Sequence, residues 1–280
     1  MRVHHLSCGT MCPRGGGWID GSGASLLTEA RLVCHVLLVE TDASGLVLVD
    51  SGLGLEDLRD PRGRLGGAFT AIARPRRDPS ATAYRRIEAL GLDPGDVRHV
   101  VLTHMDLDHA GALADFPDAT VHLTRAEHAA AMHPPTFAEK NRYRAVQWAH
   151  GPRFETYEPD GEAWLGFAAV RALVGLPPEI LMIPLDGHSR GHAAVVVRDG
   201  DRWLVHAGDA YFHAGEMDPA APTCTGGLRL FQRLAAIDPI RMRRNKERLR
   251  ELARDHAGEV EVFSAHDPGE LARMQARRAG

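Results

Sequence analysis

The chain of 280 residues has only four cysteines, and no two of them have the CxxC spacing: Cys8, Cys12, Cys34 and Cys224. A disulfide-stapled secreted domain is therefore not expected, and we interpret the cysteines as reduced thiols in a cytosolic protein. No apolar run approaches the about 20 residues of a membrane-spanning helix. The first ten residues contain histidines where a signal peptide would have an apolar core.

Blocks of one charge sign are also missing. The formal net charge is −4 and no long run of like charges occurs, so neither a nucleic-acid partner nor a membrane surface is expected. Lysine occurs only at positions 140 and 246, and arginine supplies the remaining basic residues. The expectation of a small-molecule substrate comes from the motifs below and not from the composition. The sequence carries no signal for or against an oligomer.

What the chain does have is a hydrophobic content of 44%, enough to bury a large core as one domain or as two tightly packed halves. Residues 32–50, LVCHVLLVETDASGLVLVD, predict two apolar strands around an Asp-Ala-Ser-Gly turn. Helices are expected to start at Ser80, Thr124 and Asp238-Pro239, and a last one at about Pro268. Further strands are predicted at residues 99–102, 119–123, 179–185, 193–198, 202–207 and 259–264.

Two segments lack a clear period. Residues 59–79 are rich in Gly, Pro and Arg and predict a long surface loop, and residues 134–162 predict a half-exposed covering segment. In each half of the chain, strands come first and helices follow. The natural layer arrangement is α/β (α+β): a four-layer αββα sandwich of two packed mixed sheets with helices outside.

The stretch VVLTHMDLDHAGAL (100–113) ends a predicted buried strand with His104, Asp106, Asp108 and His109. Imidazole nitrogens and carboxylate oxygens are the ligands that divalent zinc, manganese and iron accept. A short loop after a strand can aim several such side chains at one point. Taken alone, the stretch is also compatible with a turn in which Asp108 caps backbone N–H groups and the histidines are solvated.

Three more strands place a histidine or an aspartate at a corner lined by small residues. DGHSRGHAAVVV (186–197) has His188 and His192 before a strand, and LVHAGDAYF (204–212) has Asp209 after one. VFSAHDPGE (262–270) has His266 after another. Four such placements in one chain favour a metal centre over four unrelated caps.

These motifs resemble the metallo-β-lactamase superfamily, whose H-x-H-x-D-H motif is matched with one change. The hairpin ending in Asp-Ser-Gly also resembles that of the superfamily. The overall length, the extended segment before the hairpin, THMDLDHAG, the GHSRGH box, the step from His188 to Asp209 and the late AHD are most similar to the acyl-homoserine-lactone lactonase branch. The resemblance covers nearly the whole chain. It implies a single domain over residues 1–280, with two pseudo-halves of roughly 1–160 and 161–280.

The resemblance also implies two divalent metal ions held by seven side chains: His104, Asp106 and His188 for the first ion, Asp108, His109 and His266 for the second, and Asp209 bridging both. His192 would be a neighbour of the site and not a ligand. Asp50, directly after the hairpin, would orient a ligand histidine from behind.

Asp106 is the departure from the family pattern, which has histidine at this position. A carboxylate still binds metal, but hard oxygen donation moves the preference from zinc towards iron or manganese. The change resembles the flavodiiron branch, which has a glutamate here. Zinc is the first expectation, and three outcomes stay open: two zinc ions, a pair containing iron or manganese, or one strong and one weak site.

Two adjacent divalent ions lower the pKa of a bridging water, so the pattern predicts hydrolysis by a metal-bridging hydroxide without a serine or cysteine nucleophile. The resemblance implies opening of a lactone, acyl-homoserine-lactone-like, or of a related carboxylic ester. Asp108 would pass a proton to the leaving alkoxide. Lactonases carry a carbonyl-orienting tyrosine three positions beyond the bridging aspartate, where this chain has Phe212, so Tyr211 is our candidate for that role.

The apolar candidates for the substrate groove are Met105, Phe137, Trp148 and Phe212. The arginines of 142–153 are compatible with binding an acidic head group, but a solvated face is the favoured interpretation. Rival functions are a thioester or phosphodiester hydrolase on the same fold, an iron-binding redox relative, and a metal-bound scaffold that lost activity through Asp106. The redox reading would need a flavin partner domain, for which 280 residues leave no room.

Overall fold

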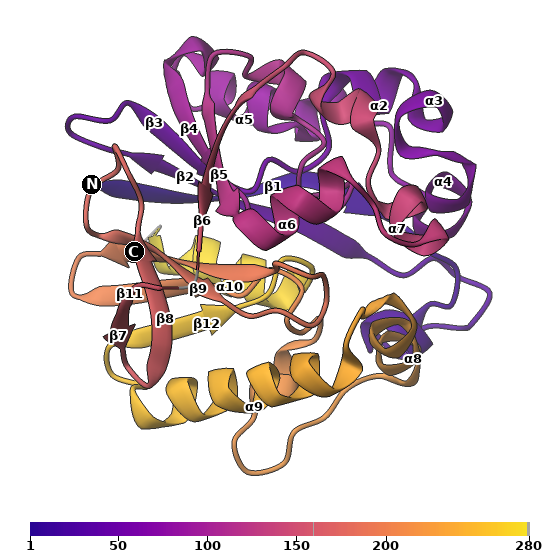
Figure 1. The fold of residues 1–280 in the computed structure, drawn as a ribbon. Coiled ribbons are helices and arrows are strands. Elements are labelled where there is room, and N and C mark those ends of the chain that lie inside the picture. Colours follow the sequence, from indigo (N-terminus) through magenta and orange to yellow (C-terminus); the bar gives the residue numbers. More distant parts are fainter. Residues whose placement is uncertain (159, 279–280) are drawn as a thin grey trace.

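Two six-stranded sheets form the centre of the computed structural model, which describes residues 1–158 and 160–278 (Figure 1). The first sheet has the order β1-β2-β3-β4-β5-β6: β1 (Arg2–Met11), β2 (Leu32–Glu40), β3 (Leu46–Val49), β4 (Val97–Val101), β5 (Thr120–Thr124) and β6 (Arg153–Tyr157). Strands β1 to β3 pair antiparallel, and β3 to β6 pair parallel.

The second sheet comes from the later part of the chain and has the order β12-β11-β10-β9-β8-β7. Its β11–β12 pair is parallel, and its other pairs are antiparallel. The strands are β7 (Glu162–Trp164), β8 (Phe167–Ala172), β9 (Ile180–Pro184), β10 (Ala193–Asp199), β11 (Arg202–His206) and β12 (Val260–Phe263).

Helices cover the outer faces of both sheets, as Figure 1 shows. Helices α5 and α6 pack on the first sheet and the long α9 on the second. The α-helices are α1 (Gly17–Asp20), α2 (Leu55–Arg59), α3 (Pro61–Leu65), α4 (Gly67–Ala73), α5 (Ala83–Ala89), α6 (Arg125–Met132), α7 (Phe137–Arg142), α8 (Gly226–Ala235), α9 (Pro239–Asp255) and α10 (Pro268–Arg278). The predicted four-layer αββα sandwich is confirmed.

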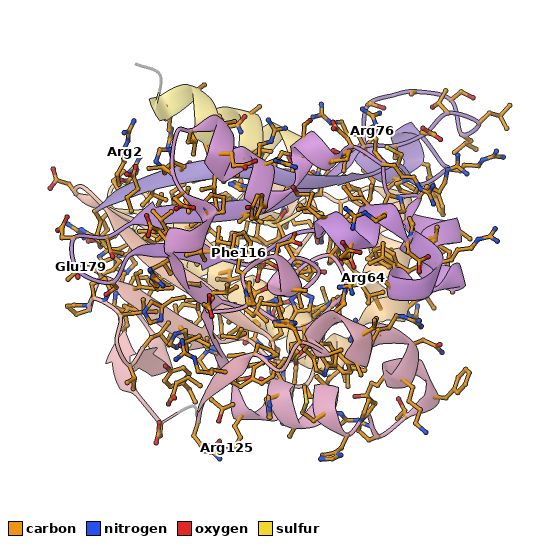
Figure 2. All side chains as sticks on the ribbon, turned by 90° about the horizontal axis from the view of Figure 1, so that it is seen from above. Arg2, Arg64, Arg76, Phe116, Arg125 and Glu179 are labelled. Carbon is orange, nitrogen blue, oxygen red and sulfur yellow. The ribbon has the colours of Figure 1, made fainter. Side chains whose placement is uncertain are left out.

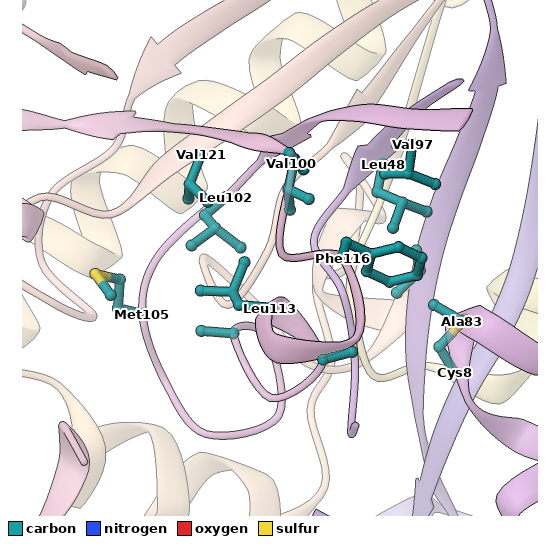
Figure 3. Close-up of a cluster of buried hydrophobic side chains, with 14 of the residues drawn as sticks. Cys8, Leu48, Ala83, Val97, Val100, Leu102, Met105, Leu113, Phe116 and Val121 are labelled. Carbon is teal, nitrogen blue, oxygen red and sulfur yellow. The ribbon is translucent and has the colours of Figure 1, made fainter. Parts of the chain in front are cut away.

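Alternation along β2 explains why this strand is apolar on both faces. Leu37 and Val39 point into the core between the sheets, whereas Val36 and Leu38 point into the core under the helices. Figure 3 shows this second core, where Phe116 lies against residues of β3 and β4. In Figure 2, seen from above, side chains fill the interior of the molecule around Phe116.

The segments without a clear period contain more structure than the sequence predicted. The prediction of a long loop over residues 59–79 is wrong, because the segment forms α3 and α4. Asp60 caps α3, and Pro61 occupies its first turn. The helix expected from Ser80 begins later, with Thr82 as its cap. The covering segment 134–162 contains α7 and the edge strand β6. In the described part of the chain, no helix has the length and hydropathy needed to cross a bilayer.

Candidate metal centre

The predicted ligands come together because their strands end at one edge of the sandwich. The loop after β4 carries positions 104–109, the turn before β10 carries His188, and Asp209 and His266 follow β11 and β12. The backbone N–H of Ala193 donates to the carbonyl of Thr103 at 2.9 Å and so joins two of these segments. The candidate ligand atoms fall into two tight groups: His104, Asp106, His188 and Asp209, and Asp108, His109 and His266.

The first group has the spacing of ligands around one ion. Nε2 of His188 lies 3.1 Å from Asp106 Oδ2 and 3.3 Å from Asp209 Oδ2, and Nε2 of His104 lies 3.4 Å and 3.7 Å from the same two oxygens. A tetrahedral ion with bonds of about 2.0–2.1 Å has ligand–ligand edges of about 3.3 Å. The four side chains therefore surround a space that fits a divalent ion.

The second group shares Asp209 with the first. Asp209 Oδ1 lies 3.3 Å from His109 Nε2 and 2.9 Å from His266 Nε2, while its Oδ2 faces the first group. Asp108 Oδ2 completes this set at 4.0 Å and 3.6 Å from the same two nitrogens. One carboxylate thus faces both spaces, with one oxygen in each.

The hydrogen bonds of the histidines fit metal ligation. Nδ1 of His266 donates to the carbonyl of Val33 at 2.7 Å, and Nδ1 of His109 donates to Asp50 at 2.8 Å, so each ring turns its Nε2 towards the centre. Burial alone would lower the pKa of both rings, but Asp209 and Asp108 more than offset burial and raise it, so a metal ion entering the centre would displace a proton from Nε2. Nε2 of His104 and Oδ1 of Asp209 are buried without a hydrogen-bond partner. Nitrogen and carboxylate oxygen atoms at these distances need positive charge between them, which is a proton in the metal-free protein and a metal ion in the loaded one, so the residues present fit two divalent ions.

Asp50 supports the centre from behind, as the resemblance implies. Its carboxylate accepts from the N–H and hydroxyl of Thr103 and from His109. Burial alone would raise the pKa of Asp50, but His109, together with His206 and His104, more than offsets burial and the pKa falls to about 2. The residue has a φ of 57°, a backbone strain that non-glycine residues accept mainly at functional sites.

His192 and Gly208 fix the backbone of the shared aspartate. Nε2 of His192 accepts the backbone N–H of Asp209 at 2.9 Å, and its Nδ1 donates to the carbonyl of Leu185 at 3.2 Å. Both ring nitrogens are occupied, which agrees with the expectation that His192 is not a ligand. Gly208 has a φ of 52°, and a Cβ there would lie 2.6 Å from His192 Nε2.

Glu127 is a supporting residue that the sequence reasoning missed. Its fully buried carboxylate accepts from the N–H of Met105, the hydroxyls of Tyr143 and Ser189, and the N–H of Gly191. It therefore ties the 104–109 loop to the 188–192 box. The only signal in the sequence was Thr124-x-x-Glu127, which predicts a helix cap and not a link to another segment.

Arg142 was expected on a solvated face but points into the centre. Its Nε forms an ion pair with Asp106 Oδ1 at 2.9 Å, and both side chains are mostly buried, with exposed fractions of 12% and 16%. Burial opposes ionisation of Asp106, but Arg142 and His104 more than offset burial and hold its pKa well below the usual range. The other arginines of this segment point elsewhere: Arg144 binds backbone carbonyls of α3, and Arg153 is exposed.

A cavity of about 440 Å³ leads to the two donor groups. Its floor contains Asp106, Asp108, Asp209 and His266, and its walls are mainly apolar: Met11, Ile19, Leu32, Phe69, Ile72, Leu107, Phe212, Leu228 and Phe231. Of the four predicted groove residues only Phe212 lines it. Met105 and Trp148 belong to the core between the first sheet and the helices that cover it, and Phe137 is exposed.

Tyr211 is placed away from the centre. Its fully buried hydroxyl donates to Glu270 at 2.9 Å, and its ring packs in the core between the second sheet and α9. This position does not support its predicted role of orienting a carbonyl, because the hydroxyl is bonded to Glu270 inside the core and Tyr211 does not line the cavity. Phe212, the next residue, faces the cavity and stacks on His266.

The αββα fold and the paired histidine–aspartate groups together define the class of metal-dependent hydrolases. The sequence profile described as the Metallo-beta-lactamase superfamily matches residues 30–247, and the chain belongs to this superfamily.

Several relatives and solved structures similar to this chain are named as hydrolases or lactonases. Probable metallo-hydrolase Rv2300c of Mycobacterium tuberculosis is 45% identical over 280 residues, 99% of this chain and 84% of that protein. The N-acyl homoserine lactonase AttM of Rhizobium radiobacter is 28% identical over 244 residues, 84% of this chain and 82% of that protein. One solved structure similar to this chain is an N-acyl homoserine lactone hydrolase with the product N-hexanoyl-L-homoserine bound at its catalytic metal centre. The two chains are 18% identical, and the match covers 97% of this chain and 95% of that chain. The TM-score of 0.70 shows that they share the fold.

Proposed function

We propose that the chain is a dinuclear-metal hydrolase that opens lactones of the acyl-homoserine type, or closely related carboxylic esters with an apolar acyl chain. The observation that carries the proposal is the cavity itself: a mainly apolar pocket whose lining includes residues of two adjacent donor groups sharing Asp209. The lactonase relatives support the same substrate class.

The cavity walls favour an uncharged substrate with an alkyl chain. Among the described residues that line it, the one cation is Arg142, and its guanidinium is already paired with Asp106. A thioester with an anionic tail would need a free positive group on the cavity wall, away from the metal ions, to balance the charge of that tail. The apolar walls instead bury an acyl chain, at about 0.8 kcal/mol for each buried methylene.

The residues of the centre have distinct roles in this proposal. Two divalent ions held by the two groups would supply a reactive water near neutral pH and polarise the ester carbonyl. Zinc is the first candidate metal, with iron or manganese as the alternatives that Asp106 favours. Asp108, on the cavity floor, is assigned delivery of a proton to the leaving oxygen. Hydrogen bonds to residues outside the ligand set hold His109, His266 and Asp209 in position.

The test combines metal analysis with a substrate panel. Protein reconstituted with zinc, manganese or iron(II) is assayed on acyl-homoserine lactones of several chain lengths, aryl esters, thioesters and a phosphodiester, by acid release or product absorbance. We expect the lactones to be the best substrates. His109→Ala and Asp209→Ala should lose at least about 10²-fold of this activity, while His133→Ala, at the end of α6 and outside the centre, stays unchanged. Metal-loaded protein that opens no lactone, or prefers a phosphodiester, would reject the proposal.

A further inference from the structure

The position that departs from the family motif also has an unexpected partner. Asp106 replaces the family histidine, and Arg142 of α7 lies against it, although the two are far apart in the sequence. Asp106 uses its two oxygens for two purposes: Oδ1 faces the guanidinium at 2.9 Å, and Oδ2 faces the ligand nitrogens of His188 and His104.

Arg142 is held in this position by more than the ion pair. Its Nη1 donates to the carbonyl of His188 at 2.8 Å, and its Nη2 donates to the carbonyl of Ala235 at 2.9 Å. These two carbonyls belong to the box before β10 and to the end of α8. The guanidinium is therefore fixed by three separate parts of the chain, with a geometry that a lysine ammonium could not reproduce.

The net charge of the Asp106–Arg142 pair is zero, as is that of a neutral histidine. An ionised aspartate in place of a neutral imidazole adds one negative charge to the ligand set, and the adjacent arginine adds one positive charge. Because both groups are largely buried, the two charges interact in a medium that screens them weakly. Oδ1 forms the ion pair with the guanidinium by distance, without a hydrogen bond, and Oδ2 is the oxygen that lies nearest the ligand nitrogens.

We propose that Asp106 and Arg142 act as one neutral unit that replaces the histidine of the motif, with Arg142 positioning Asp106 as a one-oxygen ligand of the first metal. This inference rests on the two-metal centre of the proposed function and assigns Arg142 a role beyond it. Restoring the motif by Asp106→His alone should therefore weaken the first site, because a buried guanidinium loses its counter-charge beside a divalent ion.

The experiment is a double-mutant cycle read by metal binding. Wild type, Arg142→Met, Asp106→His and the double variant are stripped of metal, then titrated with zinc, and the bound zinc is counted by elemental analysis. Lys140→Met is the matched control, since it removes an exposed cation from the same helix. Thermal unfolding of each metal-free variant shows whether the fold is intact.

We expect each single variant to bind its weaker zinc about 10–100-fold less tightly than wild type, which is the range for losing an outer contact of a ligand. The double variant should recover at least about tenfold of that loss, because histidine without a facing arginine restores a neutral ligand set. Both variants that carry the Arg142→Met change leave the same two carbonyls without a partner. A general folding defect from that loss would appear in both, and only the pair relationship predicts recovery.

Two results would overturn the inference: single variants that bind two zinc ions as tightly as wild type, or a double variant no better than the worse single variant. The lactone assay on wild type is independent of both. Wild type that binds two ions and opens no lactone would remove the proposed function while leaving the cycle interpretable.

Discussion

Replacing Glu127 by glutamine should destabilise the protein and loosen its metal centre at the same time. The two oxygens of the carboxylate each accept one backbone N–H and one hydroxyl. In Glu127→Gln, one oxygen becomes an NH2 group. The hydroxyl on that side can turn to accept, but the N–H of Met105 or of Gly191 is left facing a donor. One unsatisfied buried N–H costs about 1–3 kcal/mol, and weaker bonds to a neutral acceptor add about 1–2 kcal/mol.

The expected loss in free energy of unfolding is therefore about 2–5 kcal/mol, measured on metal-free protein by guanidinium denaturation followed by circular dichroism. Zinc affinity should fall about 10–100-fold, because the two segments that Glu127 joins carry His104, Asp106 and His188. Glu139→Gln is a matched control, a buried glutamate at the same position of the next helix, bonded to Thr136 and Arg190. A Glu127→Gln protein that loses under about 1 kcal/mol and binds zinc normally would refute the reasoning.

Three further outcomes are expected. Gly208→Ala should weaken zinc binding at least about tenfold, because its Cβ would displace His192 from the N–H of Asp209; Gly200→Ala, with a similar φ of 56° and open space around it, controls for backbone strain alone. Tyr211→Phe should keep lactone turnover within about threefold of wild type while lowering stability by about 1–2 kcal/mol, since its hydroxyl bonds Glu270 and not the cavity; a loss of turnover above about 10²-fold would restore its predicted role. Burial lowers the pKa of His122 in the folded protein from 6.5 to about 3. As the pH drops below 6.5, the unfolded chain binds a proton at His122 while the folded protein does not, so the free energy of unfolding falls until the pH reaches about 3. The wild-type free energy of unfolding should therefore fall by about 2 kcal/mol more than that of His122→Gln between about pH 7.5 and 5, as measured by denaturation at both pH values. An equal fall in the two proteins would contradict the lowered pKa of His122.

The layers of the fold could be predicted because each depends on local pattern. The apolar hairpin 32–50 and the strand before His104 are predicted by composition, and caps such as Thr124 and Asp238 fix helix starts within a residue or two. The loop assignment for 59–79 failed because glycine and arginine are weak evidence against a helix when Asp60 and Pro61 supply a good N-terminus. Strand β1 had no expectation of its own, although it pairs with β2 along most of its length.

The seven candidate ligands could be predicted from the sequence because each follows or precedes a strand end, where topology brings distant segments to one edge. Their supporting residues could not be predicted in the same way. Glu127 and Arg142 lie on helices, and the sequence around them indicates a cap and a charged face. Which buried atom they meet depends on how α6 and α7 pack over the centre, and no local period carries that information.

The outer contacts also explain why the centre has its shape before any metal binds. Three of the ligand histidines are oriented by three different parts of the chain: Thr103 beside His104, Asp50 after β3 for His109, and the carbonyl of Val33 in β2 for His266. Because the fold already pays the conformational entropy of ordering these rings, an ion that enters meets ligands close to their final spacing. The same rigidity leaves little room for a side chain of different charge at position 106 unless a neighbour compensates for it. The carboxylate at that position and the arginine that faces it are therefore best understood as one change and not two.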